Sequence, residues 1–325
     1  MRRRAFGSWA AAFSLGAGVP RFARGASLPR IAWVSGSRRD PQSPFLESLK
    51  LGLAELGRVE ERDYLIEAHW GDDSRERFDP LVAGILRTAP DLIVTQGPVI
   101  FAVQRSGTLL PVLFAFSGDP VEGRLVDSLA SPGRNLSGIS MMALELVGKR
   151  MEALAEAVPG LKRVALLTNP AHAGERRELE TSQVAAARLG LGVEYLPFEG
   201  DAGAETALSN ALRAGCQAMM VFPDAGMMRR SERFAQFALH NRMPAASGWA
   251  EFTRRGNLLS YGPNVRQVYR RLSSYVDRVL RGAKPSLLPV EMPTVVEHLI
   301  NLRAARAMGL AIPRTALLRA DELLD

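Results

Sequence analysis

Short apolar runs alternate with longer segments of helical periodicity along the chain from Arg30 onward. A short apolar run between turn signals is typical of a buried strand, and the alternation predicts βαβ units on a parallel sheet. In the first half, strands are predicted at 31–35, 64–70, 91–95 and 112–117. The helices between them are predicted at 45–57, 78–87 and 99–106. This half therefore predicts one α/β lobe with four strands.

The alternation stops at the turn-rich stretch 131–135 and begins again after a helix predicted at 146–158. Later strands are predicted at 164–168, 192–198, 218–222, 244–247 and 258–261. The helices between them are predicted at 177–189, 206–214 and 231–241. The second half therefore repeats the architecture of the first.

The C-terminal tail begins with a long amphipathic helix predicted at 265–280, which Gly282 and Pro285 end. An extended segment is predicted at 289–301, and a short last helix at 302–310. Too little chain remains for a third domain, so the tail is expected to return and complete both lobes. The predicted fold class is α/β, with two Rossmann-like lobes of parallel sheets joined by a hinge of several crossovers. The predicted lobes are 26–140 plus about 265–292, and 141–264 plus about 293–325.

Residues 1–25 have the layout of a signal peptide, with three arginines at 2–4, an apolar run at 9–19 and small residues before Ala26. The apolar run is about half the ~20 residues that a spanning helix needs. We therefore expect a periplasmic protein that begins at Ala26. The segment Arg3-Arg4-Ala5-Phe6 is similar to the twin-arginine export motif, and twin-arginine and ordinary export both stay open.

The net charge of +7 would suggest a nucleic-acid or acidic-membrane partner, but five of the arginines lie in this leader. Removing those five charges from +7 leaves +2. No helix-turn-helix pattern precedes the lobes, so no nucleic-acid partner is expected. The single cysteine, Cys216, excludes internal disulfides and lies far from the leader, so the protein is not expected to be a lipoprotein. Its expected role is that of a buried apolar side chain.

The loops after the predicted strands combine Ser, Thr or Asn with Gly or Pro in both halves. In parallel sheets, ligands bind outside the carboxyl ends of the strands, where helix N-termini present free N–H groups. Such loops suit an anionic or zwitterionic small ligand, although turns and helix caps favour the same residue types. Acidic groups at Asp119, Asp224 and Glu251 are candidates for a ligand ammonium or for helix starts. Trp249 and Tyr261 are candidates for stacking on a ligand or for sealing an interface.

Sequence signatures of enzymes are missing: the chain has no GxxxxGK[ST] loop, no GxGxxG in the first βα unit, no GxSxG elbow and no HExxH. The four histidines are too scattered for metal-ligand spacing. Asp72-Asp73 is interpreted as a solvated turn rather than a calcium loop. We therefore expect no enzymatic activity, no cofactor and no metal.

Four segments carry a resemblance to a known family. They are 116–121 (Phe-Ser-Gly-Asp-Pro-Val), 131–138 (Ser-Pro-Gly-Arg-Asn-Leu-Ser-Gly), 259–262 (Leu-Ser-Tyr-Gly) and the tail 299–310. With these segments the chain resembles, over essentially its whole length, the substrate-binding proteins of ABC transporters with a type 1 periplasmic-binding fold. The resemblance is to the branch that includes tryptophan and tyrosine binders. The chain departs from that pattern at Val99, Ile100 and Phe101, which replace small residues, and at Val295-Val296.

The resemblance implies a monomeric solute-binding component of an ABC importer, which holds a zwitterionic or anionic solute between its lobes and docks on a permease with its ATPase subunit. An amino acid is one such solute. Contact with the membrane would come only through the permease. Carried onto this chain, the ligand-facing residues would be Ser35, Ser37, Thr95, Gln96, Gly97, Ser117 and Asp119 in the first lobe, and Asn169, Asp224, Glu251 and Tyr261 in the second lobe or hinge.

Two other functions remain open from the sequence. One is a ligand-sensing periplasmic subunit of the same fold that reports to a membrane receptor. The other is an exported hydrolase on a similar scaffold, although no nucleophile and base pair can be identified from the sequence.

Overall fold

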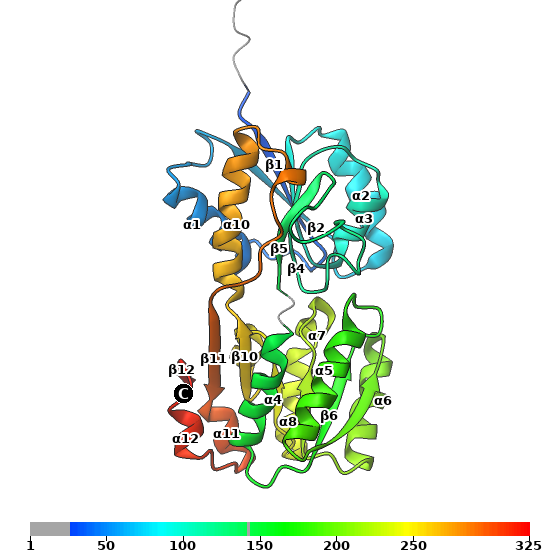
Figure 1. The fold of residues 1–325 in the computed structure, drawn as a ribbon, viewed down its shortest axis with the longest axis vertical. Coiled ribbons are helices and arrows are strands. Elements are labelled where there is room, and N and C mark those ends of the chain that lie inside the picture. Colours follow the sequence, from blue (N-terminus) through cyan, green and yellow to red (C-terminus); the bar gives the residue numbers. More distant parts are fainter. Residues whose placement is uncertain (1–26, 142–143) are drawn as a thin grey trace, which may run out of the picture.

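The computed structural model describes residues 27–141 and 144–325 and shows two α/β lobes, one above the other along the long axis (Figure 1). The predicted signal peptide at 1–25 lies outside the described residues. No helix in the described ranges is long and apolar enough to cross a membrane. The predicted α/β class with two lobes is confirmed.

The first lobe is built on a parallel five-stranded sheet of order β2-β1-β3-β4-β5. Its strands are β1 (Arg30–Ser35), β2 (Leu65–Trp70), β3 (Leu92–Gln96), β4 (Val112–Phe116) and β5 (Leu136–Ser140). Its helices are α1 (Pro44–Glu55), α2 (Arg75–Arg87), α3 (Ile100–Arg105) and α10 (Val265–Leu280), with short 3-10 turns at Gly97–Val99 and Pro285–Leu287. One apolar core lies between the sheet and α1 with α10, and a second lies between the sheet and α2 with α3. Because both faces are covered, the central strands are mostly apolar: β4 is apolar throughout, and β3 is apolar up to Thr95 and Gln96 at its carboxyl end.

The prediction of four strands in this lobe was one strand short, because β5 was missed. Its sequence, LSGIS, is too polar to be recognised as a buried strand, although all five residues are buried. Gly138 has a φ of 153°, and a Cβ at this position would collide with the backbone of Phe114 on β4. The glycine therefore lets β5 approach its neighbour closely.

The second lobe is built on a seven-stranded sheet of order β12-β11-β10-β9-β8-β6-β7. Its strands are β6 (Arg163–Thr168), β7 (Gly192–Pro197), β8 (Ala218–Val221), β9 (Ala245–Ser247), β10 (Leu259–Pro263), β11 (Val296–Asn301) and β12 (Glu322–Leu324). Its helices are α4 (Glu145–Ala157), α5 (Glu175–Arg188), α6 (Gly200–Arg213), α7 (Ala225–Arg229), α8 (Ser231–Asn241), α9 (Ala250–Arg254), α11 (Leu302–Met308) and α12 (Arg314–Leu317). The short elements α7, α9, α12 and β12 were not predicted.

One strand pair departs from the predicted parallel sheets, because β10 and β11 are antiparallel. The chain leaves the second lobe after β10 to form α10 in the first lobe, and it re-enters the second lobe at β11 (Figure 1). An outgoing strand beside a returning strand must run in opposite directions. The hinge is also held by hydrogen bonds between its segments: the Asn264 N–H donates to the Val295 carbonyl at 2.9 Å, and the Asn264 amide donates to Glu297 Oε2 at 2.8 Å.

Candidate functional site

The loops at the carboxyl ends of the strands in both lobes line two adjoining cavities between the lobes. Compartment A has a volume of about 660 Å³, and its lining includes Phe78, Phe101, Asn169, His172 and Asp224. Compartment B has a volume of about 530 Å³, and its lining includes Phe45, Gln96, Trp249, Glu251 and Tyr269. Volumes of this size suit a small organic ligand.

Seven of the predicted ligand-facing residues line this cleft. Ser37 and Ser117 line both compartments, Asn169 and Asp224 line compartment A, and Gln96, Gly97 and Glu251 line compartment B. The strand-end rule for parallel sheets therefore places these loops together in space. Their contact with a ligand stays a prediction.

The other four predicted residues do not line either compartment. Ser35 is buried, and its hydroxyl accepts a hydrogen bond from the Ser37 N–H at 3.2 Å. Thr95 is buried in β3. Asp119 forms an ion pair with Arg177, and Tyr261 packs edge-on against the His298 ring in the strand pair β10–β11.

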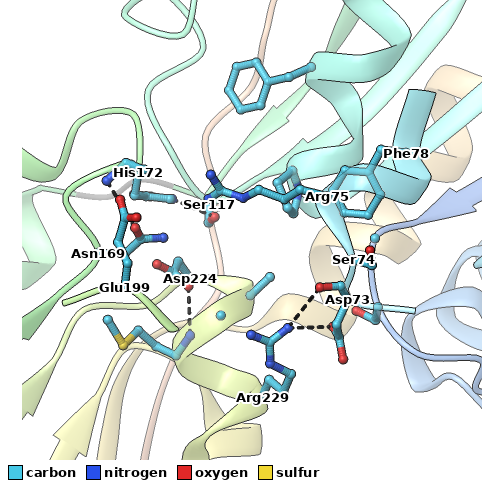
Figure 2. A pocket seen from close by; sticks show the side chains of 18 of the residues that line it. Asp73, Ser74, Arg75, Phe78, Ser117, Asn169, His172, Glu199, Asp224 and Arg229 are labelled. Atoms are coloured by element: carbon cyan, nitrogen blue, oxygen red, sulfur yellow. Dashed lines mark hydrogen bonds and ion pairs between the residues drawn. The ribbon is translucent and has the colours of Figure 1, made fainter. Parts of the chain in front are cut away.

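Asp224 presents a buried carboxylate to compartment A. It follows β8 and caps α7, because its Oδ1 accepts a hydrogen bond from the Met227 N–H at 2.8 Å (Figure 2). Its Oδ2 has no hydrogen-bond partner among the described residues, although the residue is only 4% exposed. Buried polar groups in folded proteins are almost always hydrogen-bonded. A donor from a ligand in compartment A would satisfy this oxygen.

Arg75 supplies a positive charge on the opposite wall. It is the first residue of α2, and its side chain extends into compartment A toward Ser117 (Figure 2). No carboxylate in the described part of the chain forms an ion pair with its guanidinium. Compartment A is thus lined by a guanidinium without an ion-pair partner from the first lobe and by a carboxylate with a buried, unpartnered oxygen from the second.

Asp73 and Arg229 join the lobes across the cleft and line both compartments (Figure 2). Arg229 Nη1 lies 3.4 Å from Asp73 Oδ1, and Arg38 Nε lies 3.4 Å from Asp73 Oδ2. The prediction of a turn at Asp72-Asp73 is right, since both residues have positive φ values. The prediction that this turn is simply solvated is wrong for Asp73, because it pairs with both arginines.

A second contact between the lobes lies beside compartment A. The Ser117 hydroxyl is 2.9 Å from His172 Nε2, and the Asp119 N–H donates to the Ala173 carbonyl at 3.1 Å. Asp119 also forms an ion pair with Arg177 of the second lobe. These contacts hold the ends of β4 and β6 close together.

Aromatic side chains supply the apolar walls. Compartment A is lined by Phe78, Phe101, Phe116 and Phe198. Phe101 is one of the residues by which the chain departs from the family pattern, and it packs edge-on against Phe116 with ring centroids 5.7 Å apart. The phenylalanines favour a ligand with an apolar part.

A fully buried ion pair lies in the second lobe behind the cleft. Arg150 of α4 and Glu178 of α5 have Nη1 and Oε1 3.0 Å apart, with side chains 4% and 6% exposed. Burial raises the pKa of the Glu178 carboxyl, and the Arg150 guanidinium opposes that rise. Arg150 Nε also donates to the Tyr261 carbonyl at 3.0 Å, so the pair ties α4, α5 and β10 together.

Sequence reasoning missed Asp73 and Arg75 because the loop after β2 was interpreted as a solvated turn. The available signal was its position, since it also follows a strand and precedes a helix N-terminus. Within 27–141 and 144–325, no group of three or more His, Cys, Asp or Glu residues is arranged to hold a metal ion.

Comparison with known proteins gives one family match. The model of the family described as ABC transporter substrate binding protein matches residues 44–324. A search of curated protein sequences found no match.

Solved structures of the same fold cover most of the chain. A conserved domain protein from Vibrio cholerae has a TM-score of 0.84 at 21% identity, covering 91% of this chain and 100% of that one. An ABC domain from Streptococcus pneumoniae in complex with L-Trp has a TM-score of 0.80 at 20% identity, covering 90% and 100%. An open, ligand-free substrate-binding protein with adhesive properties from Clostridium difficile has a TM-score of 0.68 at 17% identity, covering 92% and 99%. At these identities the likeness shows the type 1 periplasmic-binding fold.

Proposed function

We propose a function for this chain from one premise: it belongs to the ABC transporter substrate binding protein family. The proposed role is that of the extracytoplasmic solute-binding protein of an ABC importer. It takes up a small zwitterion with an apolar side chain, of the amino-acid class, in compartment A. It then presents the loaded form to a permease that works with an ATPase subunit.

Two charged groups without ion-pair partners on opposite walls of compartment A, Arg75 and Asp224, carry this proposal. A zwitterion has a carboxylate for the Arg75 guanidinium and an ammonium for the free Asp224 Oδ2. The two groups come from different lobes, so a ligand that bridges them stabilises the closed arrangement. The phenylalanines on the same walls suit an apolar side chain, and the S. pneumoniae structure of this fold has L-Trp bound.

The N-terminal leader and the composition support the proposed export to the periplasm. Cleavage of a signal peptide before Ala26 would release a monomeric periplasmic protein. Mass spectrometry of the protein recovered from the periplasm would test this, because the expected N-terminus is Ala26. A mature chain that retains residues 1–25 would contradict it.

Calorimetric titration of the mature protein with the common amino acids tests the ligand class. For an amino acid that binds, we expect its des-amino acid and its decarboxylated amine to bind at least ten times more weakly, because each lacks one charge. The recovered ligand is expected to be chemically unchanged. If no amino acid or other zwitterion binds, the proposed ligand class is wrong.

Asp224→Asn tests the charge of Asp224 alone, because Asn also caps helices well but carries no charge. We expect it to weaken amino-acid binding by more than tenfold and to remove the preference over the des-amino acid. Asp91→Asn is the matched control, since Asp91 precedes β3 at the end of the strand remote from the cleft and accepts from the Arg30 N–H at 2.8 Å. Equal affinities in these two variants would contradict the role of Asp224.

A further inference from the structure

A cluster of charged side chains lies beside the hinge, where the chain passes from β10 into α10. Its members are three carboxylates, Glu251 of α9, Glu297 of β11 and Glu322 of β12, and two guanidiniums, Arg254 of α9 and Arg266 of α10. Arg254 donates to both Glu322 oxygens, at 2.9 and 2.6 Å, and Arg266 Nε lies 3.3 Å from Glu251 Oε1. Within the described ranges, Glu297 forms no ion pair. The cluster therefore holds one carboxylate without a counter-charge.

Asn264 connects this carboxylate to the hinge. The Asn264 amide donates to Glu297 Oε2 at 2.8 Å, while its Oδ1 accepts from the Gln267 N–H at 2.9 Å and caps α10. The Asn264 N–H also donates to the Val295 carbonyl on the returning chain at 2.9 Å. An ionised acceptor makes a stronger hydrogen bond than a neutral one. Ionised Glu297 therefore holds the two crossing segments together more firmly than protonated Glu297 does.

The surroundings of Glu297 bring its titration close to neutral pH. Burial, and then repulsion from Glu251 and Glu322, raise the pKa of Glu297 to about 7, against the attraction of Arg254 and the hydrogen bond from Asn264. The carboxyl is thus mostly ionised at pH 8 and mostly protonated at pH 6.

Opening of the lobes changes the charge that Glu297 experiences. Arg266 lies in the first turn of α10, whose apolar face packs in the core of the first lobe, whereas Glu251 and Glu297 belong to the second lobe. When the lobes separate, Arg266 moves away from Glu251, and the charge of Glu251 then acts on Glu297 without compensation. The open arrangement consequently binds a proton at Glu297 more tightly than the closed one, so protonation favours opening.

We propose that Glu297 is a proton-sensitive switch of the hinge, which favours the closed arrangement when ionised and the open arrangement when protonated. Both effects act in the same direction, because protonation weakens the hydrogen bond from Asn264 and also relieves the repulsion from Glu251. The proposal concerns the movement of the lobes, so it does not depend on which ligand compartment A binds.

Small-angle scattering of the ligand-free mature protein at constant ionic strength tests the proposal. We expect a larger radius of gyration at pH 6 than at pH 8. Glu297→Gln keeps an acceptor for Asn264 but cannot ionise, so its radius should equal that of the parent at pH 6 at both pH values. A parent radius that does not change with pH, or a Glu297→Gln radius that changes as much as that of the parent, would overturn the proposal.

Glu194→Gln is the matched control. Glu194 lies on β7, at the opposite edge of the same sheet from β11 and β12, and its partner Arg163 is 3.8 Å away. We expect this variant to keep the pH dependence of the parent. A pH dependence lost in Glu194→Gln as completely as in Glu297→Gln would overturn the assignment to the hinge.

His172 is a second titratable group at a contact between the lobes, since its Nε2 lies 2.9 Å from the Ser117 hydroxyl. The scattering is therefore repeated with His172→Gln as the background. The change in radius between pH 8 and 6 should persist there and disappear when Glu297→Gln is added. Its disappearance in His172→Gln alone would assign the pH dependence to His172 and overturn the proposal.

A ¹³C NMR titration of the glutamate carboxyls tests the electrostatic step directly, with the Glu297 signal identified by its absence in Glu297→Gln. We expect its midpoint near pH 7. Glu251→Gln removes the repulsion and should move this midpoint to lower pH, whereas Glu194→Gln should leave it in place. A Glu297 midpoint that Glu251→Gln does not change would overturn the proposed coupling.

Discussion

Removing the charge of Glu178 should destabilise the second lobe strongly. In Glu178→Gln, the Arg150 guanidinium stays buried without its counter-charge. At the 3.0 Å separation of Nη1 and Oε1, the attraction in a medium of effective dielectric constant near 20 is on the order of 5 kcal/mol. The hydrogen bond that Gln retains offsets part of this. We expect the free energy of unfolding to fall by about 3 to 5 kcal/mol, as is typical of breaking a buried pair.

Equilibrium unfolding in urea, followed by circular dichroism, measures this loss as a lower midpoint with an unchanged slope. The matched control is Glu180→Gln on the same helix, where the Arg176–Glu180 pair has side chains 76% and 58% exposed. We expect the free energy of unfolding of Glu180→Gln to differ little from that of the parent, because solvent-exposed ion pairs contribute little to stability. A loss below about 1 kcal/mol in Glu178→Gln would refute the reasoning.

The pH dependence of Arg150→Met tests the same pair from the other side. Without the guanidinium, burial still raises the pKa of the Glu178 carboxyl above its unfolded value. The folded state then binds the proton more readily than the unfolded chain, so the stability of the variant relative to the parent should rise as the pH falls from 7 to 5. A difference in the free energy of unfolding between the Arg150→Met variant and the parent that does not change with pH would contradict this account.

Three further predictions concern other parts of the molecule. Gly138→Ala should lower the free energy of unfolding by more than about 3 kcal/mol, because the added Cβ would collide with the Phe114 carbonyl. An unchanged midpoint of urea unfolding would contradict this. Burial lowers the pKa of His298 below 6.5, so the unfolded chain binds the proton more readily and the free energy of unfolding falls as the pH drops. In His298→Gln the urea midpoint should therefore depend less on pH between 7 and 5.5, and a dependence as steep as that of the parent would exclude His298 as its source. Asp73→Asn removes the ion pair with Arg229 and should let the two lobes separate. Small-angle scattering should then show a larger radius of gyration than in the parent at low salt, with a smaller difference at high salt, and equal radii at low salt would exclude a role of this pair in holding the lobes together.

The strongly periodic elements of the fold could be predicted from the sequence, because burial on one face imposes a readable pattern. The helix at 265–280 has the predicted bounds. β5 could not be recognised, because its pairing with β4 depends on the close approach that Gly138 permits rather than on an apolar run. The direction of β11 depends on where the chain re-enters the second lobe, and local sequence does not encode that.

The candidate site was predictable to the level of loops but not of side chains. The strand-end rule identified the loops that carry Ser37, Ser117 and Asp224. It could not separate a residue that faces the cleft from one that faces the core, as Ser35 shows. Arg75 was missed because it becomes a candidate ligand-binding residue only together with the carboxylate of Asp224 across the cleft, and the two residues are more than a hundred positions apart in the chain.

The placement of α10 has a consequence for the order in which the protein is made. Its apolar stripe fills the core between the sheet of the first lobe and α1. Synthesis runs from the N-terminus, so every strand of the first lobe, and the second lobe as far as β10, emerges before this helix does. Until residue 280 has left the ribosome, one face of the first sheet is covered by α1 alone. The first lobe therefore cannot complete its core until the second lobe has been made as far as β10, and a nascent chain of this protein keeps apolar surface open to chaperones for most of its synthesis.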